Sequence, residues 1–234
     1  MPEPKRVVIF ANGVLSQPEA VLRLVESGDL LIAADGGARL CRQIGLIPSV
    51  LIGDFDSLDD DEVASLIKSG VQVIRHPLRK DFTDLELALR HAQSLGIREV
   101  VVFAALGARW DQTLANLLLP AAAGLAGMRI RLADGSQEVM LLRGGEELVL
   151  HGHPGDTVSL VPIGGNVTGV TTQGLEYPLR DETLYFGATR GLSNVLLDGG
   201  STIYSKEGLL LCVVIHQKEG GWSQAEAFIP HPSK

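Results

Sequence analysis

Two aspartates with one residue between them, Asp54 and Asp56, follow the apolar run Val50-Leu51-Ile52, which ends at Gly53. In an extended backbone, residues two apart point the same way, so the two carboxylates would lie side by side just past a buried strand. Two ionised carboxylates this close repel each other unless one takes up a proton or a cation binds between them. Mg²⁺ fits such a pair because it prefers oxygen ligands and often carries phosphates. A loop whose aspartates cap backbone N–H groups is an equally good explanation of these residues.

A second group of charged residues stands at the start of an expected helix. Thr83 and Glu86 have the spacing of a capping box, which satisfies two backbone N–H groups of the first turn. The box does not account for Lys80, Asp81 and Asp84 around the same helix start. Because helix amino termini attract anions, Asp84 could complete a carboxylate cluster with the aspartate pair while Lys80 meets phosphate oxygens.

Two glycine-led loops offer further polar groups. Asp35-Gly36-Gly37 supplies a carboxylate and a backbone that a ligand can approach closely, although a simple tight turn explains it better. Gly107 opens a loop with Arg109, whose guanidinium suits phosphate but equally suits an exposed surface. Asp111 in this loop is as well explained as a helix N-cap, and Asn116 follows one turn later.

These loops must be positioned by the elements around them. Strand-like runs cover residues 6–11, 30–34, 50–52, 71–74, 100–104 and 129–132, and helix-like runs cover 17–26, 38–44, 59–68, 84–95 and a segment from 111 that Pro120 should kink or divide. The strands are continuous apolar runs, which is typical of a parallel sheet with helices on both faces. Ligands bind such sheets beyond the carboxyl ends of the strands, where the Asp35, Asp54 and Gly107 loops all fall.

The pattern changes after Arg143. Short strand-like runs at 148–150, 157–161, 167–172, 194–198, 201–204 and 209–215 are separated by Gly, Pro and Asp, with no convincing helix. We therefore predict a three-layer α/β domain in residues 1–143, an antiparallel β-sandwich in 144–216 and a polar tail in 217–234. Within the β region, Gly191-Leu192-Ser193-Asn194 has the composition of an ordinary hairpin turn.

The composition narrows the possible functions. A net charge of −8 over 234 residues argues against a nucleic-acid surface, and no apolar stretch is long enough to span a membrane. Cys41 and Cys212 lie among apolar neighbours, which indicates reduced thiols and a cytoplasmic protein. The six histidines, among them His216, show no triad-like or metal-like spacing and are interpreted as packing or solvated residues. Phosphate-loop and dinucleotide fingerprints are missing, so a phosphate-handling site must depend on carboxylates and metal.

Together the motifs resemble the thiamine pyrophosphokinase family. They are Asp35-Gly36-Gly37-Ala38, Gly53-Asp54-Phe55-Asp56-Ser57, Asp81-x-Thr83-Asp84, Gly107-Ala108-Arg109-x-Asp111 and Gly191-Leu192-Ser193-Asn194, and their order and rough spacing also match. The resemblance implies a homodimer and Mg²⁺-dependent transfer of pyrophosphate from ATP to thiamine, which gives thiamine diphosphate and AMP.

The resemblance also implies roles for single residues. Asp54, Asp56 and Asp84 would serve the metal and the phosphates, with Arg109 as a further catalytic group. Ser193 and Asn194 would help form the thiamine site where two subunits meet. The residues expected on the ATP side are Asp35, Gly36, Lys80, Asp81, Thr83, Asp111, Gln112 and Asn116.

Two positions depart from the family pattern. Gln112 stands where the family commonly has His, and an amide cannot carry a proton as an imidazole can. Leu211 stands where animal members place a Trp against thiamine, so ring stacking is not expected there. Two other functions remain open, a metal-dependent phosphohydrolase with water as nucleophile and a non-catalytic binding protein whose carboxylates only cap loops.

Overall fold

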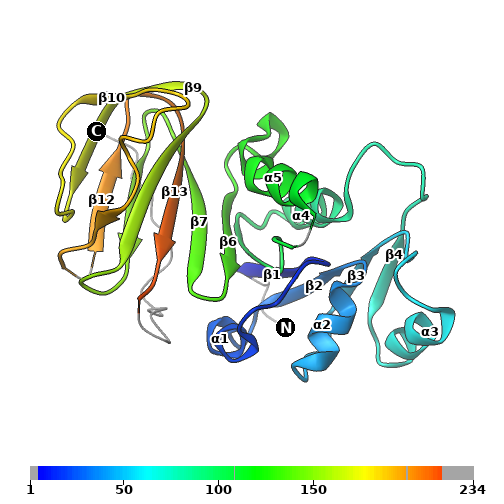
Figure 1. Cartoon of the computed structure of the whole chain (residues 1–234). Coiled ribbons are helices and arrows are strands. Elements are labelled where there is room, and N and C mark those ends of the chain that lie inside the picture. The colour runs from blue at the N-terminus through cyan, green and yellow to red at the C-terminus, as the bar shows by residue number, and fades with distance from the viewer. Residues whose placement is uncertain (1–4, 108, 199, 218–234) are drawn as a thin grey trace. The chain divides into compact units, whose positions relative to one another are not determined.

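The computed structural model describes residues 5–107, 109–198 and 200–217, and the chain forms two compact units (Figure 1). The first unit ends at Gly135 and the second begins at Ser136. The sequence pattern places the boundary later, after Arg143, because it does not reveal the strand β7 (Gln137–Arg143). Apart from Gln217, the predicted tail lies outside the described residues.

The first unit is a parallel sheet covered by helices on both faces, as predicted. Its strands lie in the order β4-β3-β2-β1-β5-β6, and all neighbours are parallel. Helices α1, α2 and α3 lie on one side of the sheet, and α4 and α5 lie on the other (Figure 1). The strands are Arg6–Phe10 (β1), Leu30–Ala34 (β2), Val50–Gly53 (β3), Gln72–Arg75 (β4), Glu99–Phe103 (β5) and Arg129–Asp134 (β6), and the helices are Pro18–Leu24 (α1), Gly37–Gln43 (α2), Asp60–Lys68 (α3), Asp84–Ser94 (α4) and Trp110–Leu118 (α5), with short 3₁₀ turns at Leu119–Ala121 and Ala123–Leu125.

Local sequence signals set the helix ends. Asp59 caps α3 in a reciprocal box with Glu62. At α4 only half of the predicted box forms, because Thr83 accepts from the Glu86 N–H at 3.2 Å while the Glu86 carboxylate accepts from Arg90 at 2.8 Å. The α5 helix stops before Pro120, as predicted. Within the described ranges, no helix has the length and apolar character needed to cross a bilayer.

The order of the sheet has a switch point between β1 and β5. From β1 the chain adds β2, β3 and β4 on one side, and β5 and β6 on the other. Open α/β sheets bind ligands beyond the carboxyl ends of their strands, at such a point. The loop after β1 meets the loop after β5 there, since Gly13 donates to the Ala104 carbonyl at 2.9 Å and Val14 donates to Leu106 at 2.8 Å.

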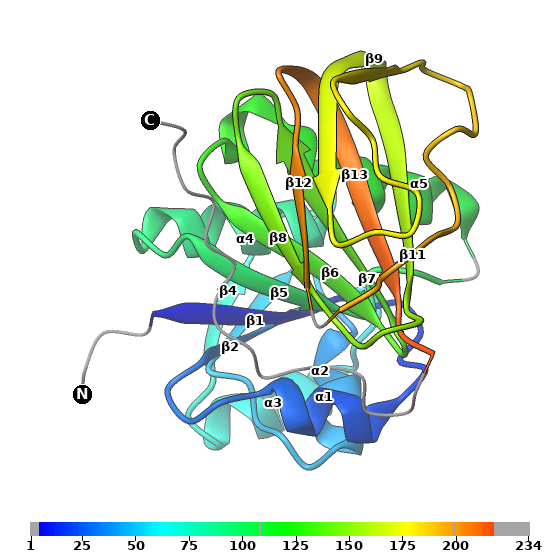
Figure 2. The ribbon, with the colours of Figure 1, turned by 90° about the vertical axis from the view of Figure 1, so that its left-hand side faces the viewer.

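The second unit is an antiparallel β structure arranged around one long strand, β9 (Thr157–Gln173). The first half of β9 pairs with β13 (Glu207–Ile215), and its last residues pair with β12 (Gly200–Tyr204). Strands β7 and β8 (Glu147–His151) extend the two sides, and the short strands β10 (Glu182–Leu184) and β11 (Asn194–Val195) also pair with β9. The two predicted strands 157–161 and 167–172 are therefore one strand. In Figure 2 the strands of this unit are seen at full length.

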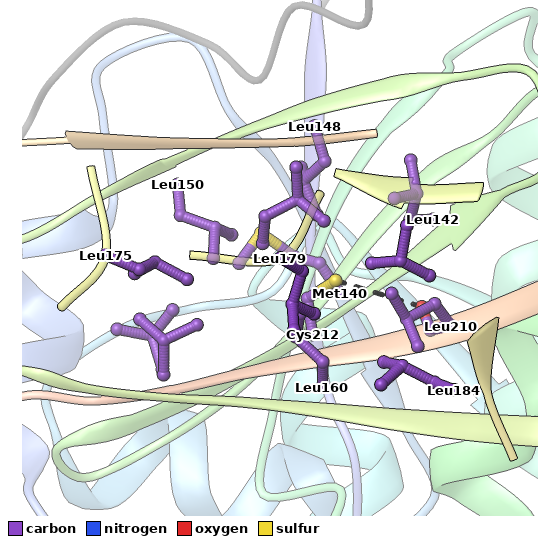
Figure 3. Close-up of a cluster of buried hydrophobic side chains, with 14 of the residues drawn as sticks. Met140, Leu142, Leu148, Leu150, Leu160, Leu175, Leu179, Leu184, Leu210 and Cys212 are labelled. Atoms are coloured by element: carbon purple, nitrogen blue, oxygen red, sulfur yellow. Dashed lines mark hydrogen bonds between the residues drawn. The ribbon is translucent and has the colours of Figure 1, made fainter. Parts of the chain in front are cut away.

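Aliphatic side chains from most of these strands fill the interior of the second unit (Figure 3). Leu148, Ile203 and Leu210 are completely buried. Alternation along the strands places these residues on one face, which is how a half-buried antiparallel sheet forms its core. The fully buried Cys212 belongs to the same core, and burial raises the pKa of its thiol.

A buried ion network lies in the second unit. His216, just past β13, is only 4% exposed and stands between the Asp156 carboxylate, 2.8 Å from its Nδ1, and the Glu138 carboxylate, 2.9 Å from its Nε2. Asp156 also accepts the backbone N–H groups of His153 and Gln217. Both imidazole nitrogens face carboxylates, so the charged imidazolium satisfies both bonds. The interpretation of His216 as a packing or solvated residue is therefore wrong.

Candidate active site

The carboxyl ends of β2 and β3 bring the predicted aspartates together. The two strands are parallel neighbours with Ala34 opposite Ile52, and the Asp35 N–H donates to the Ile52 carbonyl at 2.8 Å. One ligand oxygen from each of Asp35, Asp54 and Asp56 lies within 4.8 Å of the others. We call these three residues the carboxylate trio. The grouping of Asp54 with Asp56 was predicted, and the structure adds Asp35 to it.

The backbone reaches this arrangement by turns and not by the extended chain that the spacing suggested. Phe55, between Asp54 and Asp56, has a left-handed backbone (φ 65°), and its ring is buried. Asp35 after β2 (φ 48°) and Ala104 after β5 (φ 54°) are also left-handed. Side chains other than glycine adopt this conformation at a cost, which often marks functional sites. The turn at Phe55 lets Asp54 Oδ1 accept the Asp56 N–H at 3.3 Å.

Asp35 has one satisfied and one free carboxylate oxygen. The residue is 5% exposed, and its Oδ2 accepts from the Ser57 hydroxyl and from Asn12 Nδ2 at 3.4 Å. Its Oδ1 is buried with no hydrogen-bond donor among the described residues. A buried carboxylate oxygen without a partner is costly. A cation at the trio would satisfy it, and carboxylate oxygens are ligands that Mg²⁺ prefers, so these residues fit the predicted metal.

Lys80 links Asp84 to the trio. Its Nζ lies 2.6 Å from Asp54 Oδ2 and 2.7 Å from Asp84 Oδ1, and its side chain is only 12% exposed. Asp84 is the first residue of α4, and Thr83 caps that helix, so the cap and the charge cluster coexist. The structure thus places an ammonium group between Asp54 and Asp84, and Asp84 lies outside the trio. Its role as a metal ligand stays a prediction.

The three linked groups have shifted pKa values. Burial alone would raise the pKa of Asp54, but hydrogen bonds from Lys80 and the Asp56 N–H outweigh it and lower that pKa. Burial raises the pKa of Asp84, and Lys80 offsets this only in part. Burial alone would lower the pKa of Lys80, but its hydrogen bonds to Asp54 and Asp84 outweigh burial and raise that pKa. Carboxylates pushed apart in pKa are typical of sites that handle charge.

The loop before α5 carries exposed charge. Arg109, not Asp111, is the N-cap residue of α5, so the interpretation of Asp111 as the cap is wrong. The two side chains pair at 2.5 Å and are about two-thirds exposed, at 67% and 66%. Asn116 donates to the Ala105 carbonyl at 2.6 Å, which ties α5 to the end of β5. Gln112 and Asp81 are exposed, and roles for these residues toward ATP stay predictions.

Close packing accounts for the glycines after Asp35. A Cβ on Gly36 would lie 2.2 Å from the Asn12 side chain, and a Cβ on Gly37 would lie 2.0 Å from the Phe10 carbonyl oxygen. The Phe10 backbone has no room to shift, so Gly37 excludes larger residues for packing reasons, whereas a Cβ on Gly36 would fit only if the Asn12 side chain moved aside. The loop after β2 therefore needs a residue without a side chain at Gly37, where it packs against the end of β1. The predicted role of Gly36 toward ATP stays a prediction beside this structural one.

Sequence reasoning missed two polar residues of this site. Ser57 entered the sequence analysis only as the last residue of a motif, and Asn12, which follows the predicted strand 6–11, did not enter it. Both contact Asp35, and Asn12 Nδ2 also donates to Ser57 Oγ at 3.1 Å. The position of Asn12 directly after β1, at the switch point, is the signal that could have identified it.

In the second unit, the predicted thiamine residues lie in a firmly held turn. Ser193 is exposed with a left-handed backbone (φ 56°), and its N–H donates to Ser159 Oγ at 3.1 Å. Asn194 is buried, and its amide donates to the Tyr177 carbonyl at 2.7 Å and accepts from the Tyr177 N–H at 3.0 Å. Asn194 thus supports the loop, while the Ser193 hydroxyl is accessible. Leu211 is buried, 8% exposed.

Comparison with known proteins gives one consistent family. Residues 21–131 match the family model for the thiamin pyrophosphokinase catalytic domain, and residues 147–210 match the model for its vitamin B1 binding domain. Thiamine pyrophosphokinase from Bacillus subtilis is 26% identical over 209 residues, which is 89% of this chain and 98% of the relative. Thiamine pyrophosphokinase 1 of Arabidopsis thaliana is 28% identical over 88% of this chain and 86% of that protein.

Solved structures agree. The crystal structure of the Bacillus subtilis enzyme superposes with a TM-score of 0.81 over 92% of this chain and all of that one, at 26% identity. The Geobacillus thermodenitrificans thiamin pyrophosphokinase gives a TM-score of 0.78 at 25% identity over 90% of this chain and 97% of that one. The matched models, relatives and structures confirm the fold class and the enzyme activity predicted from the motifs, and the chain belongs to the thiamine pyrophosphokinase family.

Proposed function

We propose that the carboxyl edge of the first unit's sheet transfers pyrophosphate from ATP to the hydroxyl of thiamine, with Mg²⁺ as cofactor. The observation that carries this proposal is the trio of Asp35, Asp54 and Asp56, with ligand oxygens within 4.8 Å of one another beside the buried Lys80. Asp35, Asp54 and Asp56 would hold the metal, which would supply positive charge to offset the charge that develops on the phosphate oxygens. The unpartnered Oδ1 of Asp35 supports it as a ligand.

The side chains around the trio would bind and orient the phosphates. Lys80, held by Asp54 and Asp84, presents a fixed positive charge, and Arg109 offers an exposed guanidinium fork. In the reaction the thiamine hydroxyl oxygen bonds to the β-phosphorus, the bond from that phosphorus to the bridging oxygen breaks, and AMP leaves with that oxygen. A carboxylate of the site accepts the hydroxyl proton. Positioning of the two substrates would supply most of the rate.

For thiamine we propose a site in the second unit. The accessible Ser193 hydroxyl and the exposed residues Tyr177, Tyr185 and Phe186, at 57%, 62% and 62%, support it, because rings and hydroxyls suit the aromatic rings and positive charge of thiamine. The match of residues 147–210 to a vitamin B1 binding domain points to the same unit. We further propose a homodimer whose active site lies near the subunit interface.

We also propose that the protein works in the cytoplasm. Cys41 and Cys212 are both free and buried, and burial raises the pKa of the Cys41 thiol to about 12. Thiols that stay protonated are unreactive, and free thiols are usual in reducing compartments.

The direct test is a reaction of the purified protein with Mg²⁺ and ATP, with and without thiamine. We expect AMP and thiamine diphosphate in equal amounts, and neither without thiamine or after chelation of the metal. Separation of nucleotides and thiamine esters by chromatography measures both. ADP with thiamine monophosphate would show attack on the γ-phosphorus, and nucleotide breakdown that ignores thiamine would favour a phosphohydrolase.

Lys80 gives a second test. The Lys80→Met variant should lower turnover by about 10²–10³-fold, because it removes a preorganised charge near the phosphates and leaves two carboxylates facing each other. The Lys80→Arg variant should retain part of the activity because the charge remains. Lys68→Met, on the last turn of α3, is the control and should react at the rate of the unmodified protein. Steady-state assays at saturating ATP measure the effect, and a Lys80→Met turnover within threefold of normal would contradict it.

A further inference from the structure

The Asn12 side chain contacts two groups at the carboxyl ends of the strands, the Asp35 carboxylate and the Ser57 hydroxyl. Its Nδ2 is 3.4 Å from Asp35 Oδ2 and 3.1 Å from Ser57 Oγ. The amide nitrogen carries two hydrogens, so it can donate to both. The Ser57 hydroxyl, which accepts from Asn12, donates in turn to the same Asp35 Oδ2. Two donors therefore hold one oxygen of Asp35, while Oδ1 of the same carboxylate has no donor in the described part of the chain.

Backbone contacts fix the place of Asn12. The residues on either side of it are bonded to the end of β5, since Ala11 donates to the Phe103 carbonyl and Gly13 to the Ala104 carbonyl, both at 2.9 Å. On its other side, the Asn12 amide lies against Gly36, where an added Cβ would be 2.2 Å from Asn12 Oδ1 and 2.7 Å from Nδ2. Asn12 thus occupies a slot between the loop after β1 and the loop after β2.

We propose that Asn12 is a positioning residue for the cation site: it holds Asp35 Oδ2, directly and through Ser57, so that Oδ1 faces the metal. This inference rests on the proposed function of the trio. Groups that hydrogen-bond a metal ligand commonly matter about 10–100-fold to metal affinity, because they restrict the ligand to one orientation. Asn12 itself touches neither substrate nor metal in this role. It acts through the orientation of Asp35.

Gly36 provides an independent way to disturb the same contact. Its backbone lies in the ordinary right-handed helical region (φ −57°), so alanine fits the backbone there. The added methyl group would collide only with the Asn12 side chain among its three nearest atoms. The Gly36→Ala variant should therefore displace the amide of Asn12 while it keeps every backbone N–H of the loop.

The experiment measures binding of Mn²⁺ alone to the full chain by electron paramagnetic resonance, without nucleotide. We expect Asn12→Ala and Gly36→Ala each to weaken Mn²⁺ binding about 10-fold. The double variant should bind no more weakly than Asn12→Ala, because the methyl group then has nothing left to displace. Gln93→Ala is the control. Gln93 lies near the end of α4, and its side-chain amide donates to the Gly124 carbonyl. The variant loses an amide donor, as Asn12→Ala does, and should bind Mn²⁺ as the unmodified protein does.

Kinetics provide a second readout. In Asn12→Ala, the Mg²⁺ concentration for half-maximal rate should rise about 10-fold, and turnover should recover at high Mg²⁺ with KM for thiamine unchanged. A purely structural role would instead lower the melting temperature and leave the Mg²⁺ requirement as it was. Asn12 is largely exposed, so its loss should leave the fold intact.

The outcomes separate this inference from the proposed function. If the unmodified protein and Asp54→Asn bind Mn²⁺ equally weakly, the cation site itself is wrong. If the unmodified protein binds Mn²⁺ and Asp54→Asn does not, but Asn12→Ala binds normally, the positioning role is overturned while the site stands. The positioning role would also be overturned if the double variant lost as much Mn²⁺ affinity as the two single variants combined. Gly36 would then act on the site by another route than Asn12.

Discussion

The Asp54→Asn variant is expected to lose activity by about 10³-fold or more while it keeps its fold. Asparagine has the same shape and can still accept the Asp56 N–H through its oxygen. It lacks the charge that Asp54 contributes to the trio and to the ion pair with Lys80, 2.6 Å away. The proposed cation would lose a ligand, and Lys80 would lose one of the two carboxylates that its ammonium group contacts.

Turnover with ATP and thiamine measures this loss, and circular dichroism with thermal melting checks the fold. Asp60→Asn is the matched control, since Asp60 is an exposed aspartate in the first turn of α3. Its loss weakens only a helix-dipole interaction of about 0.3–1 kcal/mol and should leave turnover unchanged. An Asp54→Asn protein that reacts within tenfold of the normal rate would refute the assignment of the catalytic edge.

The second large effect is expected on stability, from His216→Ala. Removal of the imidazole leaves the Glu138 and Asp156 carboxylates buried without the cation between them. Breaking a buried ion pair by removal of one partner costs about 3–5 kcal/mol in the free energy of unfolding. Urea unfolding followed by circular dichroism measures it. His151→Ala, which removes a half-buried histidine from β8, is the control and should cost under about 1 kcal/mol.

A second substitution identifies the cause. In His216→Ala, the additional change Glu138→Gln removes one of the two buried negative charges that faced the imidazolium, so it should restore part of the lost stability. A loss due only to a cavity would not be recovered by this change. An unfolding free energy of His216→Ala within about 1 kcal/mol of normal would show that the network contributes little.

The same network makes stability depend on pH. Burial alone would lower the pKa of His216, but its bonds to Glu138 and Asp156 outweigh burial and raise that pKa. Its contribution is therefore fully present below the unfolded histidine value, about 6.5, and is lost as pH rises through the higher folded value. Burial alone would raise the pKa of Asp156, but its hydrogen bonds outweigh burial and lower that pKa. The stability that Asp156 contributes is therefore lost only as pH falls through its folded pKa. The free energy of unfolding should therefore decline above neutral pH in the unmodified protein, and this decline should be absent in His216→Ala.

Much of the first unit could be predicted because its signals are local. The strands are short and mainly apolar, most clearly at Leu30–Ala34 and Val50–Gly53, and the α3 and α4 helices carry their own caps. The grouping of Asp54 and Asp56 likewise depends on residues adjacent in the chain. The strand β7 was missed because its burial is set by pairing with β13, about seventy residues later. The continuity of β9 was missed because Gly164 and Gly165 resemble a strand end.

The features that escaped sequence reasoning depend on distant contacts. His216 meets partners 60 and 78 positions away in the chain, so no local spacing could reveal the network. Asn12 reaches Ser57 across 45 positions, and Lys80 reaches Asp54 across 26. Each of these pairs forms only when the strands take their places in the sheet. Residue type indicated that Lys80 and Asp54 were chemically important, but the sheet order determines what they touch.

The left-handed turns described above have a consequence for how such an enzyme can change over generations. Asp35, Phe55 and Ala104 each lie just past the carboxyl end of a strand, and Ser193 lies in the proposed vitamin-binding turn. Each such residue costs the folded chain about 1 kcal/mol or more relative to relaxed backbone. Adaptation to a hotter habitat could remove that strain only by reshaping the loops that carry the chemistry. Heat-adapted descendants must therefore gain their stability elsewhere, in the aliphatic core or on the outer helix faces, while these few turns stay strained.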